Sequence, residues 1–352
     1  MITGDITPAE WAHFCTFTAR VRRLAYDSEG PLHVDPLVWT ILARKCRGEP
    51  LLPRLRLIEA LEINNADVPA LVSFLTPILR DVTVWFRGAK GFEPASEFCT
   101  SVKVLFQTLV CVTPHLTALD WGAPYDRCCG TDFLASIGCL RNLSSLRLHG
   151  KTSDTPSAVS TQVPIATLLW EITTITPLVS LSLNVELFAG PNGALTAVAG
   201  STLPALHTLE VCITNGPAEM LATFVHSLRL PALQSLVVDT RYSPLGYSTL
   251  EDQLPRICAN LPSSLREFHW SHMVRTSIPS SMPPSDIHRI LGPLLSFRAM
   301  RCVEFRLPLS TSPLHTTDDG VAQLAAAWPD VQKLRMYNRH VSSYHARLQA
   351  GE

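Results

Sequence analysis

The sequence lacks an excess of charge of either sign. Its 352 residues include 29 Lys and Arg against 30 Asp and Glu, which gives a formal net charge of −1. A protein that grips a phosphate backbone normally shows a basic excess, so the composition argues against nucleic acid as a partner. Hydrophobic residues make up 46 % of the chain and charged residues 17 %, which excludes an intrinsically disordered protein and supplies material for a core.

Long hydrophobic runs are also absent. The longest apolar stretches, such as VKVLFQTLVCV at 102–112, are too short to cross a bilayer, and the start MITGDITPAEW does not read as a signal peptide. The 10 cysteines form no C-x-x-C pair and lie in apolar surroundings, so we expect buried free thiols rather than disulfides or a zinc site. These features predict a cytoplasmic or nuclear protein with no membrane contact.

Motifs that carry catalysis are missing as well. The sequence contains no G-x-x-x-x-G-K-(S/T), G-x-G-x-x-G, H-E-x-x-H or G-x-S-x-G, and its 12 histidines are scattered. Asp318 and Asp319 stand at a predicted helix start, where carboxylates complement the helix dipole. We therefore expect no catalytic residue, no cofactor, no metal site and no enzymatic activity.

The sequence does contain a recurring motif. LPALHTLEV at 203–211 returns as LPALQSLVV at 230–238, an interval of 27 residues (230 − 203). Its core, L-x-x-L-x-L, is the signature of leucine-rich repeats, and the last two apolar positions mark a short strand with one buried face. Copies lie at 116–121, 143–148, 178–183, 206–211, 233–238, 265–270, 300–305 and 331–336, with weaker copies at 58–63 and 79–86.

The segments between these motifs are predicted to be helices. Apolar residues follow helical spacing at 132–142, 165–175, 217–228, 285–297 and 318–328. Ser285 or Asp286, and Asp318 or Asp319, are candidates to cap two of these helices. Strand, helix and parallel strand in alternation predict an α/β leucine-rich-repeat solenoid of about ten irregular repeats, with a curved parallel sheet on the concave face and helices on the convex face.

The first fifty residues contain no copy of the L-x-x-L-x-L motif. Thr7, Pro8 and Glu10 form a capping box, and the apolar residues from Trp11 to Leu24 follow helical spacing. A second helix is expected at 36–46. We predict a helical cap at 1–50, a solenoid at 51–338 and a C-terminal tail at 339–352.

Strand geometry predicts which side chains face a partner. Residues flanking the inward-pointing leucines lie on the concave face, where ten strands form a ribbon long enough for a protein interface. The residues between the last two apolar positions of each motif form a middle row, which contains Glu62, Thr83, Ser182 and Val237. The residues two positions later form the next row, which contains Asn64, Gly122 and Asn184. We predict a protein substrate on this face, contacted by Trp85, Asp120, Arg147, His149, Glu210, Asp239, His269, Glu304, Arg306, Arg335 and Tyr337. For Trp85, core packing is an equally good reading.

The N-terminal helix also carries a family pattern, formed by Ile6, Thr7, Pro8, Glu10, Trp11, Phe14, Ala19, Val21, Arg22 and Leu24. Followed by irregular leucine-rich repeats, this helix resembles the region after the F-box in the large F-box protein family of mushroom-forming fungi. The resemblance implies a substrate receptor of a cullin–RING ubiquitin ligase, in which an upstream F-box holds the adaptor subunit. No L-P-x-E-(I/L/V) pattern precedes Thr7, so contact with the adaptor would require an F-box upstream. The alternative is an interaction scaffold unrelated to ubiquitination.

Overall fold

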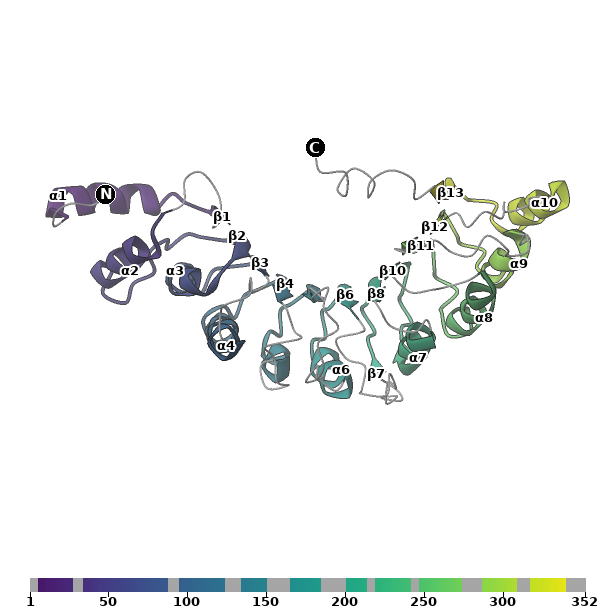
Figure 1. Cartoon of the computed structure of the whole chain (residues 1–352), viewed down its shortest axis with the longest axis horizontal. Coiled ribbons are helices and arrows are strands. Elements are labelled where there is room, and N and C mark those ends of the chain that lie inside the picture. The colour runs from purple at the N-terminus through teal and green to yellow at the C-terminus, as the bar shows by residue number, and fades with distance from the viewer. Residues whose placement is uncertain are drawn as a thin grey trace, which may run out of the picture. The chain divides into compact units, whose positions relative to one another are not determined.

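The computed structural model describes residues 6–27, 34–87, 95–123, 134–150, 165–184, 201–213, 219–241, 247–273, 287–308 and 317–339. The chain divides into two compact units, Met1–Leu178 (unit 1) and Val179–Glu352 (unit 2). In each unit, parallel strands form the inner layer and helices the outer layer (Figure 1). The fold class predicted from the sequence is therefore confirmed within each unit.

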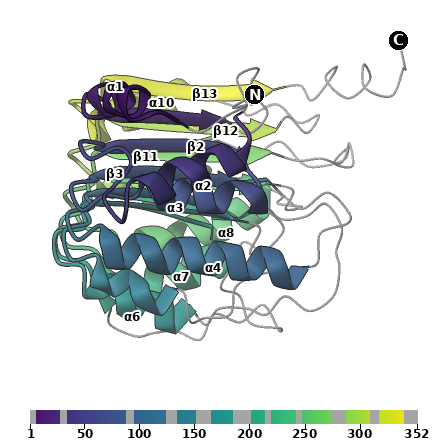
Figure 2. The same ribbon diagram turned by 90° about the vertical axis from the view of Figure 1, so that its left-hand side faces the viewer.

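Unit 1 contains five parallel strands that neighbour one another in chain order. They are β1 (Arg23–Asp27), β2 (Leu57–Ile63), β3 (Asp81–Phe86), β4 (Ala118–Ala123) and β5 (Ser145–Gly150). The helices are α1 (Pro8–Thr18), α2 (Pro36–Lys45), α3 (Val68–Phe74), α4 (Ala95–Val112) and α6 (Ile165–Thr173), with short 3₁₀ turns η1 (Asn65–Asp67) and η2 (Leu134–Cys139). Figure 2 shows α2, α3 and α4 following one another along the outer layer.

Unit 2 repeats the arrangement. Its main sheet contains β6 (Ser180–Asn184), β8 (Thr208–Ile213), β10 (Ser235–Arg241), β11 (Glu267–Met273), β12 (Cys302–Pro308) and β13 (Lys333–Arg339), all parallel. A second, two-stranded sheet pairs β7 (Ser201–Thr202) with β9 (Leu228–Arg229). The helices are α7 (Glu219–Ser227), α8 (Tyr247–Cys258), α9 (Ile287–Leu291) and α10 (Asp318–Ala327), and η4 (Gly292–Ser296) continues α9 as a 3₁₀ turn.

A repeated backbone contact fixes the register of the strands. In most strands of the main sheets, the residue before the strand and the first residue of the strand both donate N–H groups to one carbonyl of the preceding repeat. His207 and Thr208 donate to the oxygen of Val179 at 2.9 and 3.0 Å, and Gln234 and Ser235 donate to that of His207 at 2.9 Å each. This contact aligns Leu181, Leu209 and Leu236 on adjacent strands, so the repeated leucines stack as predicted.

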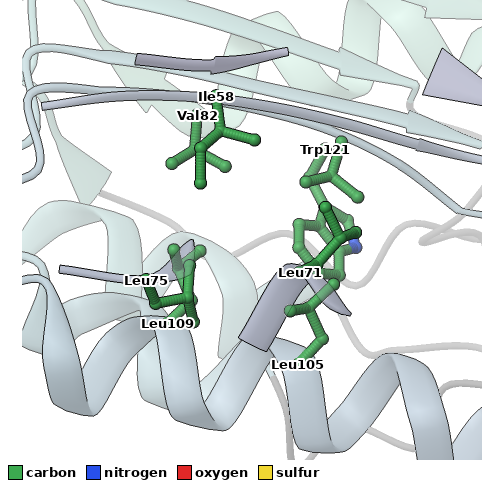
Figure 3. A pocket seen from close by; sticks show the side chains of 8 residues that line it. Ile58, Leu71, Leu75, Val82, Leu105, Leu109 and Trp121 are labelled. Atoms are coloured by element: carbon green, nitrogen blue, oxygen red, sulfur yellow. The ribbon is translucent and has the colours of Figure 1, made fainter. Parts of the chain in front are cut away.

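The core of each unit lies between its sheet and its helices. Leu119, Leu146, Leu181, Leu209 and Leu236 are at most 1 % exposed. In unit 1, Ile58 and Val82 of the strands point toward Leu105 and Leu109 of α4, as Figure 3 shows. The cavity left between them is about 10 Å³, at the lower limit of what one water molecule needs. This part of the core offers no room for a small ligand.

The N-terminal segment differs from the prediction. Thr7 and Glu10 form the expected capping box, but the helix ends at Thr18, so Val21 and Leu24 are not helical. Residues 23–27 form β1 instead, paired in parallel with β2. The edge of β2 offers unpaired backbone groups, and satisfying them outweighs the weak helical spacing of this segment.

The inward positions of β2 were also assigned wrongly. Ile58 and Ala60 are buried, whereas Leu61 is 37 % exposed, and the register shifts between Ala60 and Ile63. Glu62 adopts a φ of 52° at this irregularity. A bulge of this kind reorients the following side chains, so Glu62 and Asn64 leave the predicted rows and Glu59 pairs with Thr83 in their place.

Three smaller expectations need correction. Residues 134–139 form a 3₁₀ turn rather than an α-helix, and the predicted helix at 285–297 is α-helical only over Ile287–Leu291. The cap of α10 is Thr317, whose hydroxyl accepts from the Gly320 N–H at 3.1 Å, rather than Asp318 or Asp319. The candidate caps Ser285 and Asp286 lie outside the described residues.

The cysteines within the described ranges are free thiols, but most of them are not buried as expected. Cys258 is buried, and burial raises its pKa to about 12. Cys15, Cys111 and Cys139 are exposed. Apolar neighbours in the sequence were a poor guide here, because a helix or turn in an apolar stretch still has an outer side.

Candidate partner-binding face

The candidate site is the side of each sheet that does not pack against helices, named here the strand face. Strand pairing places Thr83, Asp120 and Arg147 in one row of unit 1 and Trp85, Gly122 and His149 in the next. The corresponding rows of unit 2 are Ser182, Glu210, Val237, His269, Glu304 and Arg335, and Asn184, Cys212, Asp239, Ser271, Arg306 and Tyr337. From β3 to β5 and from β6 to β13, the rows match the prediction.

In unit 1, an indole lies across the middle of this face. Trp85 of β3 is 36 % exposed, so it is not a core residue. Its Nε1 donates to Asp120 Oδ1 at 3.0 Å, and its ring centroid is 5.7 Å from that of His149 on β5. The indole reaches over β4 because Gly122, its pairing partner there, has no side chain. A Cβ at Gly122 would come within 3.2 Å of Trp85 Cγ.

The neighbours of this indole add polar groups. His149 Nε2 lies 3.6 Å from Asp120 Oδ1, so one carboxylate oxygen orients both rings. Arg147, which pairs with Asp120 across the strands, is exposed beside them. We name Trp85, Asp120, Gly122 and His149 the indole cluster. It presents an aromatic ring held in one position on an open surface.

In unit 2, the strand face contains an open hollow of about 340 Å³. We name it the polar hollow, because most of the side chains that line it are charged or polar. They are Glu210, Ser235, Val237, Asp239, Glu267, His269, Trp270, Ser271, Glu304 and Arg306. Trp270 is almost fully buried and forms part of the floor.

Glu304 is the most enclosed charged group of the polar hollow. Its side chain is 5 % exposed, and its Oε1 accepts from Arg306 Nε at 2.8 Å and lies 2.7 Å from Arg306 Nη2. Its Oε2 lies 3.0 Å from Lys333 Nζ. Burial alone would raise the pKa of Glu304, but the hydrogen bonds from Lys333 and Arg306 outweigh it, so the pKa lies below its ordinary value.

His269 completes this network. Its Nδ1 lies 3.7 Å from Glu304 Oε2. Burial lowers the pKa of His269 despite the opposing effect of Glu304 and Glu267, so the imidazole is neutral at pH 7. Glu210 and Glu267 have no hydrogen bond or ion pair from their side chains within the described ranges. Glu304 is therefore neutralised by two cations, while the side chain of Glu267 is exposed and that of Glu210 is partly exposed.

The structure brings the predicted site residues together in two groups. Trp85, Asp120, Arg147 and His149 gather in unit 1, and Glu210, Asp239, His269, Glu304 and Arg306 line the polar hollow of unit 2. Arg335 is exposed beside Glu304 on β13, and the side chain of Tyr337 lies outside the described part. Sequence reasoning missed the role of Gly122 as the floor under Trp85, although a glycine inside a strand indicates close approach of another group.

The strand face carries charged, polar and aromatic side chains. In the part of the chain that the structure describes, no group of three or more His, Cys, Asp or Glu side chains is arranged to hold a metal ion. No helix among the described residues has both the length and the apolarity needed to cross a bilayer. The polar hollow is open, and its most enclosed carboxylate, Glu304, is already paired with Arg306 and Lys333.

Comparison with known proteins found similarity to solved structures. No family model and no curated protein matches it. The leucine-rich repeat-containing protein LegL7 from Legionella pneumophila has a similar structure, with a TM-score of 0.44 and 11 % identity over 93 % of this chain and 96 % of that one. A structure of the Rad7 and Elc1 complex in yeast gives a TM-score of 0.38 and 10 % identity over 96 % and 94 %. The TLR13–ssRNA13 complex gives 0.36 and 13 % over 92 % and 48 %.

Proposed function

We propose that this chain is a non-enzymatic protein-interaction module that binds a partner protein on its strand face. The observation that carries the proposal is the indole cluster of unit 1. Trp85 is exposed, yet Asp120 and His149 hold it in place. Tryptophan dominates binding energy at protein interfaces, and an already ordered side chain loses little entropy when a partner packs on it.

The surroundings of Trp85 fit the same role. A protein interface combines an aromatic centre with polar groups that fix the orientation of the partner. Arg147 lies exposed beside the indole, and the polar hollow supplies further charged groups on the strand face of unit 2. Small-molecule sites are concave and mostly apolar, whereas this hollow is open and lined by carboxylates.

A matched pair of tryptophan variants tests the proposal. Trp85→Ala removes the indole from the strand face, while Trp170→Ala removes one that is 68 % exposed on α6, on the helix side of unit 1. Proteins captured from cells by the natural chain should be lost with Trp85→Ala and kept with Trp170→Ala. Equal capture by both variants, with both folded by circular dichroism, would remove the support for the strand face.

We further propose that the partner is the substrate of a cullin–RING ubiquitin ligase and that this chain is its F-box type receptor, acting in the cytoplasm or nucleus. The support is the resemblance of residues 6–24 to the segment that follows the F-box in the fungal family. In the test, the gene is extended upstream to include any in-frame F-box, and the tagged product is purified from its own cells. The proposal requires that the adaptor and cullin subunits co-purify with the extended protein and not with residues 1–352.

An interaction scaffold unrelated to ubiquitination is the second candidate. The strand face alone supports it, because recognition by the indole cluster needs no ligase subunit. The same purification separates the two: stable partners without adaptor or cullin, even with the upstream sequence included, select the scaffold. Loss of those partners in Trp85→Ala would still support binding by the strand face.

A further inference from the structure

Three arginines occupy the same position in three successive repeats of unit 1. Arg22, Arg56 and Arg80 each come directly before a strand, at the start of β1, β2 and β3. Arg56 N donates to Arg22 O at 2.9 Å and Arg80 N to Arg56 O at 2.9 Å. The repeated backbone contact that sets the register therefore also stacks these residues in a column. Neighbouring strands are about 4.8 Å apart, so the column places three cations along roughly 10 Å of the sheet edge.

The three side chains of this arginine column are exposed. Across the described ranges, none of their guanidinium groups makes a hydrogen bond or an ion pair. Two carboxylates of β2 and β3 have other partners. Glu59 faces Arg23 at 3.9 Å, and Asp81 Oδ1 accepts from the Thr117 hydroxyl at 3.4 Å. Thr117 stands at the equivalent position before β4, where the column ends.

A column of like charges is unfavourable for folding, because equal charges on adjacent strands repel. The surroundings increase the positive charge. Arg20 and Arg54 lie close by in the sequence and are exposed, while Arg23 faces Glu59. The net charge of the whole chain is only −1, so this concentration is a local feature of one edge.

We propose that the arginine column binds an acidic polypeptide segment, rich in Asp or Glu, of a partner protein. A guanidinium group presents a planar fork of donors that matches a carboxylate with two parallel hydrogen bonds. Three such forks in a row fit a short extended run of acidic residues, and the backbone groups beneath them are already satisfied. This edge is separate from the indole cluster, so the inference does not depend on the function proposed for the strand face.

A peptide fits these observations better than a nucleic acid. Affinity for nucleic acid grows with the number of phosphates neutralised along the backbone, and three cations in a row cover only a short stretch. Single-strand binding also uses aromatic side chains on which bases stack. The three stacked positions of the column are all arginine, so they supply charge without a stacking ring.

Fluorescence anisotropy with defined probes tests the proposal. The probes are a labelled polyglutamate peptide of about ten residues, a polyglutamine peptide of the same length and a single-stranded DNA of equal charge, all at low ionic strength. The natural chain should bind polyglutamate and not polyglutamine. The triple variant R22Q/R56Q/R80Q should weaken that binding by about tenfold or more.

A second triple variant, R141Q/R229Q/R289Q, serves as the matched control. It removes the same charge from exposed arginines scattered over both units, and it should stay within about twofold of the natural chain. The proposal is overturned if polyglutamate does not bind or if both triple variants lose binding equally. It is also overturned if the DNA binds more tightly than the peptide, which would assign the column to nucleic acid.

Discussion

At the scale of single residues, the polar groups that the fold encloses determine how the protein responds to pH. His272 of β11 is 6 % exposed, and its Nδ1 lies 2.7 Å from Thr240 Oγ1. Its Nε2 is buried without a hydrogen-bond partner in the described part. Burial lowers the pKa of His272 from 6.5 to about 4, against smaller raising effects of Thr240 and Asp239. A proton added to this ring would place a charge inside the core.

The first prediction concerns His272. Because its pKa is lower in the folded state, the unfolded chain binds a proton first, and stability falls as the pH drops from 6.5 toward 4. We expect this group to cost about 2 kcal/mol between roughly pH 7 and pH 5. Urea titrations of the natural chain and His272→Gln at both pH values measure the cost. A difference between the two proteins that stays constant with pH would show that His272 does not titrate as described.

The second prediction concerns Glu304. Its pKa is lowered, so its contribution to stability is present above its ordinary value of 4.5 and is lost as the pH falls through its folded value. Glu304→Gln removes the carboxylate that pairs with Arg306 and Lys333, and we expect a loss of about 1.5–3 kcal/mol near neutral pH. The gap between the two proteins should narrow in acid below 4.5. A gap that widens in acid would contradict the charge network.

At the scale of elements, a buried hydrogen bond attaches β1 to the sheet. Tyr26 of β1 donates its hydroxyl to Asp67 Oδ1 at 2.6 Å, and Asp67 Oδ2 accepts from the Asn64 N–H at 2.9 Å. Asp67 is fully buried. The one side chain therefore connects the first strand to the turn that precedes α3.

The third prediction follows from this contact. Tyr26→Phe removes the donor and leaves a buried carboxylate with less compensation, which we expect to cost about 1–3 kcal/mol. Hydrogen exchange should show that the amides of β1 lose protection more than those of β3. Uniform loss of protection through unit 1 would mean that β1 is not held mainly by Tyr26.

The stacked leucines carry the fourth prediction. Leu236 of β10 is completely buried, whereas Val237 next to it is partly exposed on the strand face. Leu236→Ala should destabilise unit 2 by about 2–5 kcal/mol because it leaves a cavity, and Val237→Ala should cost much less. Chemical denaturation measures both. Equal costs would contradict the assigned direction of these side chains.

The elements also show what could be read from the sequence. Strands β3 to β13 of the main sheets follow the repeated motif. The spacing of its leucines and the alternation of side chains along a strand allow only one pairing register between neighbouring strands. Near β2, the motif can be placed in two ways. Its apolar positions can be Leu55, Ile58 and Ala60 or Ile58, Leu61 and Ile63, and only the bulge distinguishes the two. β1 has no such motif. An edge strand is held by backbone groups, which any residue supplies, so its sequence need not follow the motif.

At the scale of the whole molecule, no single repeat can bury its own apolar residues. In a solenoid, each repeat contacts mainly its neighbours, so stability is a sum of repeats and their interfaces. The same arrangement places side chains from successive repeats in rows, which is why the rows of the strand face were predictable. The pairing of Glu304 with Lys333 and Arg306, and the placement of Trp85 over Gly122, depend on side-chain conformations across strands that spacing alone does not give.

The central claim is that a partner protein binds the strand face, and site-specific photo-crosslinking in living cells tests it most directly. A photoreactive amino acid in place of Arg147 lies beside the indole cluster, and one in place of Trp170 lies on the helix side of the same unit. The account predicts a discrete crosslinked protein from position 147 that disappears with Trp85→Ala. Crosslinks to a discrete protein from position 170 alone would contradict it.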